Sequence, residues 1–154
     1  MTTIKKELAV AALENGTVID RIPAHKLYQV VTMLKLDTIS NSITIGNNLQ
    51  SGKLGKKGII KVADYFFHDE EINKIALLAP DATINVIRNY KVVEKYNITL
   101  EETLRGIIRC NNPKCISNNE PMETVFHVTA HNPVEVTCRY CNHTIKANKI
   151  EICK

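Results

Sequence analysis

Five cysteines lie in the last third of the chain, and their spacing constrains the fold more than any other feature of the sequence. Residues 1–109 contain none, whereas four of the five form the pattern Cys110-x4-Cys115 and Cys138-x2-Cys141, with 22 residues between the two pairs. Two close thiol pairs, each on a turn, are how a tetrahedral four-cysteine zinc site is assembled. The spacing favours structural zinc, and it leaves an iron–sulfur centre, disulfides or free thiols as alternatives.

A metal ion held by four sulfur atoms has no position left for a water molecule, so such a site stabilises a fold and does not catalyse a reaction. A β-rich unit of about 50 residues is small enough to need this stabilisation. Cys153 stands outside the two pairs and is interpreted as a free thiol. The sequence therefore predicts two domains, residues 1–99 without cysteine and residues 100–154 with the zinc site.

The first domain alternates between patterns typical of strands and of helices. The β-branched residues at 17–22 predict a strand, and Pro23 can open the helix that follows it. Apolar residues spaced by three and four predict that this helix covers residues 27–36. A second helix is predicted at residues 69–79, because acidic residues at its start suit the positive end of the helix dipole.

The remaining patterns of the first domain predict strands. Residues 43–45 and 59–62 form two of them, joined by a long connection at 46–58, and residues 84–95 form the last, with a bend at Asn89 that can split it. The order is strand, helix, strand, strand, helix, strand. This is the ferredoxin-like pattern, an α+β fold in which two helices cover one face of an antiparallel sheet.

The second domain contains only short patterns. Thr99 and Glu102 have the spacing of a capping box and predict a short linking helix before Gly106. Short alternating runs follow at 125–128, 134–136 and 144–147. We therefore expect the ferredoxin-like domain to be followed by a small all-β zinc-binding domain.

The charge balance gives weak support to nucleic-acid binding. The chain carries 20 Lys and Arg against 16 Asp and Glu, a formal net charge of +4, and it contains no Trp. Dedicated nucleic-acid binders are more basic, and single-strand binders are richer in aromatic residues. A zinc-ribbon protein that binds nucleic acid through its more basic tail is kept as the alternative function.

The sequence contains no enzyme signature and no long apolar stretch. Residues 46–53 approach a phosphate-binding loop, but five residues rather than four separate the glycines, and Leu54 follows the lysine. The longest apolar run near the start, residues 8–13, is shorter than a signal-peptide core or a membrane span. We expect a cytoplasmic protein that is not an enzyme and contacts neither a membrane nor nucleic acid.

Three charged residues of the first domain could together bind a nucleotide, although surface charges of this kind are common without a ligand. In the usual ferredoxin-like order the first strand lies between the third and the last, which places Asp20 between Lys61 and Lys95. Two ammonium groups can neutralise phosphates, and a carboxylate can accept hydrogen bonds from ribose hydroxyls. Three solvated residues on an exposed sheet face are the alternative.

The chain also contains several strings that are more specific than single residues. Those in the first domain are Gly16-Thr-Val-Ile-Asp20, Ile43-Thr-Ile-Gly46 and Asn89-Tyr90-x-Val92-Val93-x-Lys95. Those in the second are Cys110-x4-Cys115-Ile-Ser, Glu120-Pro121 and Cys138-x-Tyr140-Cys141. Through these strings the chain resembles, from end to end, the family of aspartate carbamoyltransferase regulatory subunits.

The resemblance implies a non-catalytic allosteric chain of pyrimidine biosynthesis. Its first domain would bind CTP and ATP competitively, with UTP assisting CTP, and would form a homodimer with a second regulatory chain. Its zinc domain would dock onto catalytic chains. The nucleotides and the catalytic chains are thus the expected partners.

The resemblance also implies roles for single residues in the nucleotide pocket. Lys95 would hold phosphates, Asp20 the ribose, and Lys61 the base edge or a neighbouring phosphate. Lys57 falls where the family uses a basic residue for a second nucleotide. The other residues carried over by position frame the base or line the pocket: Val10, Ala12, Leu13, Val18, Ile87, Tyr90 and Val92.

Two positions of this pocket depart from the family pattern. Arg21 stands where the family commonly has His, and Ala11 stands where an acidic residue is often found. Because an arginine is permanently charged and bidentate, phosphate contact should persist, whereas titration near neutral pH is lost. These departures leave open which nucleotide inhibits and which activates.

Overall fold

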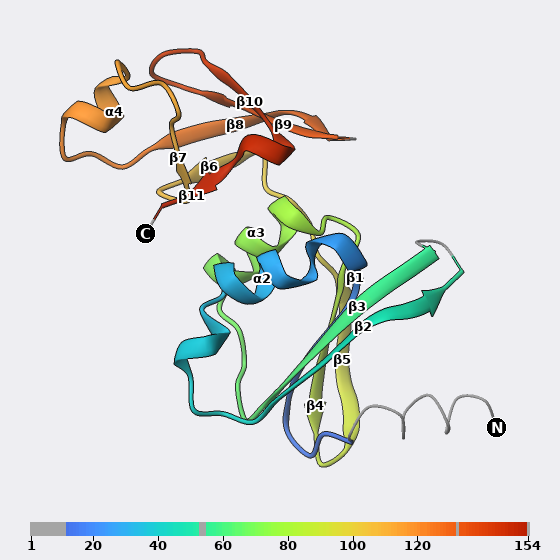
Figure 1. Ribbon diagram of the computed structural model, residues 1–154. Coiled ribbons are helices and arrows are strands. Elements are labelled where there is room, and N and C mark those ends of the chain that lie inside the picture. The colour runs from blue at the N-terminus through green and yellow to red at the C-terminus, as the bar shows by residue number, and fades with distance from the viewer. Residues whose placement is uncertain (1–11, 53–54, 132, 154) are drawn as a thin grey trace. The chain divides into compact units, whose positions relative to one another are not determined.

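The computed structural model describes residues 12–52, 55–131 and 133–153. The chain divides into two compact units, Met1–Thr99 and Leu100–Lys154 (Figure 1). Each unit has its own sheet and its own buried core, and each is described by itself. In the part of the chain that the structure describes, no helix is long and apolar enough to cross a membrane.

A five-stranded antiparallel sheet is the framework of the first unit. Its central strand, β1 (Gly16–Pro23), lies between β3 (Gly55–Ala63) and β4 (Thr83–Arg88). The edge strands are β2 (Ile43–Ser51), beside β3, and β5 (Lys91–Asn97), beside β4. The predicted position of the first strand is confirmed, and the last predicted strand is a hairpin of β4 and β5.

Two helices, α2 (Leu27–Met33) and α3 (Asp69–Leu78), lie on one face of this sheet (Figure 1). Each helix buries apolar side chains, among them Val30 of α2 and Ile75 of α3, both fully buried. A helix with one apolar side gains its stability from burying that side against a partner surface. The sheet with two helices on one face confirms the predicted α+β fold.

Isoleucines on the three central strands form the sheet's contribution to the core. Ile19 of β1 pairs with Ile60 of β3 and with Ile84 of β4, and none of the three is more than 1% exposed. Because successive side chains of a strand point to opposite faces, Val18 and Asp20 belong to the other face of the sheet. Among the described residues, that second face carries no helix (Figure 1).

A β-bulge interrupts β1 after Asp20. The pairing of β1 with β3 shifts between Ile19 and Ile22, and Arg21 has a φ of 63°. The Asp20 carboxylate accepts the Arg21 backbone N–H at 2.7 Å, which supports this left-handed conformation. After the bulge, Ile22 returns to the core with no exposed surface.

A four-stranded antiparallel sheet is the framework of the second unit. Its strands lie in the order β10 (Thr144–Lys146), β9 (Val134–Cys138), β8 (Val125–His131) and β6 (Thr103–Arg105). Phe126 of β8 is fully buried at its centre, where it pairs with residues of both neighbouring strands. The predicted small β-rich unit is confirmed.

Shorter elements complete the second unit. The strand β7 (Ile108–Arg109) pairs with β11 (Glu151–Ile152) in a separate two-stranded sheet. A single helical turn, α4 (Ile116–Asn119), follows Cys115, and a 3-10 turn at Ala147–Lys149 precedes β11.

Three predicted elements differ from the structure. Thr99 to Glu102 form no helix, because the Glu102 carbonyl accepts the Val128 N–H at 2.8 Å and the chain continues as β6. In the predicted long connection, residues 46–51 and 55–58 instead continue β2 and β3, which pair through to Ser51 and Gly55 with one register shift. The first helix ends at Met33, and a separate 3-10 turn at Leu36–Thr38 follows.

Gly16 provides a test of how β1 packs against β3. Its φ is 142°, and a Cβ atom on this residue would collide with the Val62 carbonyl oxygen. We expect Gly16→Ala to lower the free energy of unfolding of the first unit by about 3 kcal/mol, through overpacking and backbone strain. Chemical denaturation measures the change.

Gly52→Ala is the matched control for this substitution. A Cβ atom on Gly52 would meet no atom within 4 Å. The control should therefore change stability by less than about 0.5 kcal/mol. Equal stability of the Gly16 and Gly52 variants would contradict the close approach of β1 to β3.

Candidate functional site

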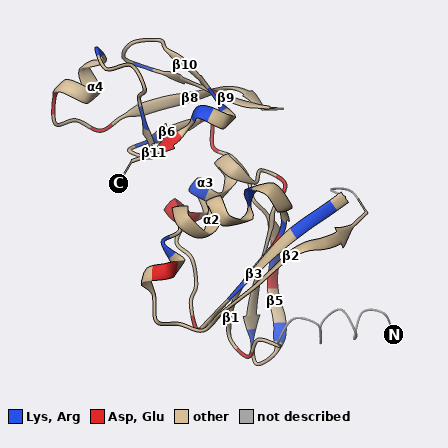
Figure 2. Cartoon of the chain, in the orientation of Figure 1, with Lys and Arg blue, Asp and Glu red and all other residues tan. Residues whose placement is uncertain are grey.

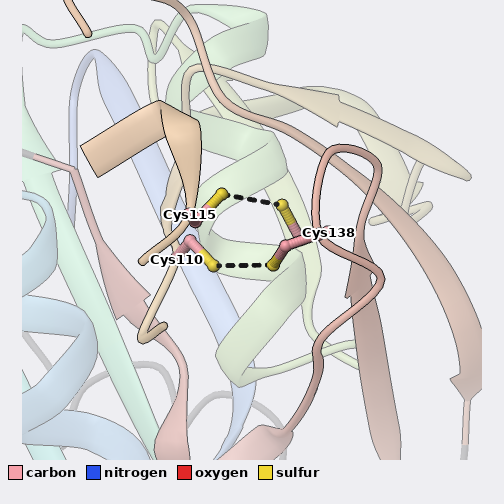
Figure 3. A group of neighbouring side chains, drawn as sticks. Cys110, Cys115 and Cys138 are labelled. Atoms are coloured by element: carbon pink, nitrogen blue, oxygen red, sulfur yellow. Dashed lines mark hydrogen bonds between the residues drawn. The ribbon is translucent and has the colours of Figure 1, made fainter. Parts of the chain in front are cut away.

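The sulfur atoms of Cys110, Cys115, Cys138 and Cys141 lie together in the second unit, all within 4.8 Å of one another. The Sγ atoms of Cys110 and Cys141 are 3.6 Å apart, and those of Cys115 and Cys138 are 3.7 Å apart (Figure 3). Around a tetrahedral metal with bonds of about 2.3 Å, two sulfur ligands are about 3.8 Å apart. The four side chains therefore fit a tetrahedral metal ion as they stand.

Side-chain amides of α4 shape the loop that carries Cys110 and Cys115. The Asn118 amide donates to the Cys110 carbonyl oxygen at 2.9 Å, and the Asn119 amide donates to that of Cys115 at 2.8 Å. Each amide makes a second hydrogen bond, at 2.8 and 3.1 Å, to a carbonyl oxygen inside the loop. The sequence analysis missed both asparagines, although adjacent asparagines just after a cysteine pair are a signal for such capping.

The end of β9 and the tight turn after it carry the other two cysteines. Cys138 is the last residue of β9, and its N–H donates to the His143 carbonyl oxygen at 2.9 Å. Asn142 has a φ of 59°, and its N–H donates to the Cys138 carbonyl oxygen at 2.9 Å. Asparagine tolerates this left-handed conformation, so the turn can bring Cys141 back beside Cys138.

Burial and hydrogen bonds shift the pKa values of Cys110, Cys138 and Cys141 in different directions. Burial raises the pKa of Cys110 to about 12 and also raises the pKa of Cys138. Burial acts in the same direction on Cys141, but hydrogen bonds with the Asn112 side chain and the His143 backbone help lower its pKa to about 7. Four thiolates at this spacing need a cation to offset their desolvation and mutual repulsion. The cluster is therefore a closed, structural metal site.

The sheet face opposite the helices holds the predicted nucleotide-binding lysines. Lys61 of β3 pairs with Val18 of β1. Val18 pairs in turn with Asn85 of β4, and Asn85 pairs with Lys95 of β5. Residues paired directly across strands share a face, so the two lysines flank Val18 and Asn85 in one row. Basic residues are coloured along β3 and β5 in Figure 2.

A cavity of about 250 Å³ lies beside Lys61. Predicted residues that line it, besides Lys61, are Ala12, Leu13 and Tyr90. Sequence reasoning missed its other lining residues: Glu14, Asn15, Ser42, Thr44, Ala63 and Asp64. Strand pairing could have found Thr44, which lies directly opposite Lys61 in the sheet. The Tyr90 N–H donates to the Glu14 carbonyl oxygen at 2.9 Å and joins two sides of the cavity.

The other predicted pocket residues do not line this cavity. Val10 lies outside the described residues. Ile87 of β4 pairs with Val92 of β5 and with Gly16 of β1, which puts all three on the same face as the lysine row. The residues outside the lining of the cavity are Val18, Asp20, Arg21, Lys57, Ile87, Val92 and Lys95.

The strand order puts Asp20 between the strands of Lys61 and Lys95, as predicted, but Lys95 is not on the strand next to Asp20. Lys95 lies on β5, two strands away from β1, because the last predicted strand is a hairpin. Asp20 forms an ion pair with Lys57, whose Nζ lies 2.9 Å from Oδ1 and 3.1 Å from Oδ2. The bulge at Arg21 fixes the carboxylate beside this lysine, which the family resemblance assigns to a second nucleotide.

Comparisons with known proteins match both units. Residues 8–99 match the family model described as the aspartate carbamoyltransferase regulatory chain, allosteric domain. Residues 102–151 match the model described as the metal binding domain of the same chain. No finding favours a zinc-ribbon nucleic-acid-binding protein.

Several curated proteins named as aspartate carbamoyltransferase regulatory chains are similar to this chain along nearly their whole length. That of Parabacteroides distasonis is 53% identical over 148 residues, 96% of each chain. That of Phocaeicola vulgatus is 56% identical over 92% of this chain and 91% of its own, and that of Pyrococcus horikoshii is 49% identical over 94% and 96%. The chain therefore belongs to the family of aspartate carbamoyltransferase regulatory chains, in which an allosteric domain is followed by a metal-binding domain.

Proposed function

We propose that the first unit binds CTP and ATP competitively, with UTP assisting CTP, and that the zinc-bearing second unit transmits their occupancy to catalytic chains. The single observation that carries this proposal is the row of Lys61 and Lys95 on one sheet face, beside a cavity of about 250 Å³. Two ammonium groups on one face suit a triphosphate, and the adjoining cavity offers room for the rest of a nucleotide.

Charge balance on this face supports the division of roles. Asp20 and Lys57 form an ion pair on this face, and Lys61 and Lys95 contribute the two ammonium groups of the row. In the proposal Lys95 holds phosphates and Lys61 contacts the base edge or a neighbouring phosphate. Asp20 accepts hydrogen bonds from the ribose hydroxyls, and Lys57 serves a second nucleotide.

The remaining assignments concern the base and the pocket walls. Tyr90 and Ile87 frame the base together with the backbone of residues 12 and 13. Val10, Val18 and Val92 line the pocket, and Arg21 adds a permanent positive charge at its edge. Because guanidinium does not titrate near neutral pH, effector binding should lack a pH dependence from this position.

The metal of the second unit is proposed to be zinc. Four thiolates in tetrahedral spacing are typical of structural zinc, and each sits on a loop whose backbone is already hydrogen bonded. Bound zinc stabilises the fold of the unit and leaves no position for a substrate. Reduced thiols are maintained in the cytoplasm, where we expect the protein to act.

The second unit is proposed to dock onto catalytic chains through its metal-binding loops. Ile116 and Tyr140, beside Cys115 and Cys141, are 52% and 41% exposed. Large apolar side chains held out by a rigid metal-bound loop are typical anchors of a protein interface. A homodimer through the first unit is supported by its uncovered edge strand β5, where Val92 and Val93 are more than half exposed.

Regulation in this arrangement is a coupling free energy between two sites. A nucleotide on the first unit changes catalysis only if it binds more tightly in one quaternary state of the assembly than in the other. Equal affinity for both states would shift nothing. The catalytic residues then belong to the partner chains, and nucleotide binding to this chain shifts the equilibrium between the quaternary states.

Substitution of Lys95 tests the nucleotide pocket. Removal of an ammonium group that bonds a phosphate costs about 2 kcal/mol, so Lys95→Ala should weaken CTP and ATP binding about 30-fold. Metal content and assembly with catalytic chains should not change. Isothermal titration calorimetry measures the affinities.

Lys74→Ala is the matched control, because Lys74 lies on α3, a helix on the opposite face of the sheet. It removes the same charge from the chain and should leave nucleotide affinity within twofold. Equal CTP affinity of the Lys95 and Lys74 variants would reject the pocket assignment.

Substitution of a metal ligand separates the two units. We expect Cys141→Ser to lower the zinc content from about one ion per chain to near zero and to prevent association with catalytic chains. The first unit should stay folded, because its core shares no ligand with the metal. Elemental analysis and size-exclusion chromatography with catalytic chains measure both effects.

Cys153→Ser is the control for loss of a thiol outside the metal cluster. It should keep the zinc and the assembly. A Cys141→Ser chain that retains its metal and still assembles would show that Cys141 is not needed to bind the metal or to associate with catalytic chains.

A further inference from the structure

We propose that the C-terminal strand holds Cys110 in place and thereby slows the release of the metal. This C-terminal clamp consists of residues 151–153 paired with residues 107–109, immediately before Cys110. The proposal rests on the zinc site proposed above and goes beyond it. It assigns a kinetic role to the last residues of the chain.

The clamp is a short antiparallel pairing, extended by one further backbone hydrogen bond. Ile152 pairs with Ile108 and Glu151 with Arg109, and the Cys153 N–H donates to the Ile107 carbonyl oxygen at 2.7 Å. Ile108 has no exposed surface. A buried apolar side chain and a short backbone hydrogen bond together oppose separation of the two segments.

The two cysteine loops are supported unequally without this clamp. Cys138 ends a strand of the four-stranded sheet and pairs with the fully buried Phe126 of β8. In the described part of the chain, the strand that leads into Cys110 has only β11 as a sheet partner. Pairing with residues 151–153 therefore adds to the attachment that the segment before Cys110 has through the Gly106 N–H, which donates to the Thr124 carbonyl oxygen at 2.8 Å.

The amides of Asn118 and Asn119 do not replace this attachment. Their hydrogen bonds run to carbonyl oxygens of residues 110–115, so they fix the shape of the first loop and move with it. The clamp instead reaches other parts of the unit. It ties the strand before Cys110 to β11, which follows the second cysteine pair in the sequence and lies outside the first loop.

Release of the metal to a chelator requires that the thiolates leave one after another. The loop that opens most often sets the rate, because local openings differ in free energy across a structure. Loss of the Cys153 hydrogen bond and of the adjoining pairing should raise the opening of the first loop about tenfold. The rate of metal transfer should rise by the same factor.

The experiment uses the full-length zinc-loaded chain and three variants. Cys153→Pro removes the backbone donor, whereas Cys153→Ala removes only the thiol and keeps the donor. A chain that ends at Ile152 removes the donor without introducing proline, so a second variant remains if the proline chain does not fold. Zinc transfer to 4-(2-pyridylazo)resorcinol is followed by absorbance, and hydrogen exchange is measured over residues 107–115.

We expect the proline variant and the shortened chain to release zinc about tenfold faster than the wild-type chain, and the alanine variant to stay within twofold of it. Faster hydrogen exchange over residues 107–115 in the same two variants would support the clamp independently of the metal assay. Equal release rates and equal exchange in all four chains, each loaded with zinc, would overturn it. A wild-type chain that binds no zinc would overturn the proposed metal site itself.

Discussion

The structure of the second unit depends on four clustered thiols, three of them buried, whose thiolates need a cation to offset their mutual repulsion. Cys110 and Cys115 lie on a loop shaped by two asparagine amides, and Cys138 and Cys141 lie at the end of a sheet strand. A metal ion at this cluster would therefore join two segments that are separated by 22 residues in the sequence. A small unit with this fastening can keep a defined surface towards a partner, which a regulatory chain needs in order to pass on a change of state.

In the first unit, the feature on which the proposed effector site depends is the positive charge on one face of the sheet. The helices of this unit cover one face, and the charged row lies on the other face beside apolar residues such as Val18 and Ile87. One ion pair, between Asp20 and Lys57, neutralises part of that charge. The row of Lys61 and Lys95 then provides the anion-binding potential on which the proposed effector site depends.

The sequence predicted the metal ligands and the order of elements, because cysteine spacing and apolar periodicity are local signals. It did not predict contacts that depend on strand pairing. Lys95 lies on a separate edge strand. Asp20 forms its ion pair with Lys57 beside Arg21, which adopts a left-handed conformation. That conformation could not be predicted, because the position holds neither glycine nor asparagine, the residues that usually adopt it. The capping-box pattern at residues 99–102 was likewise overridden, because pairing of β6 with β8 satisfies the backbone there.

In the proposed mechanism, nucleotide binding to the first unit is felt by catalytic chains through the metal-binding second unit. The most direct measurement reconstitutes the zinc-loaded chain with catalytic chains and records the half-saturating aspartate concentration with and without CTP or ATP. The account predicts a shift with each nucleotide that disappears when zinc is removed and the chains separate. A shift that persists with the metal-free chain, or no shift in a fully assembled zinc complex, would contradict it.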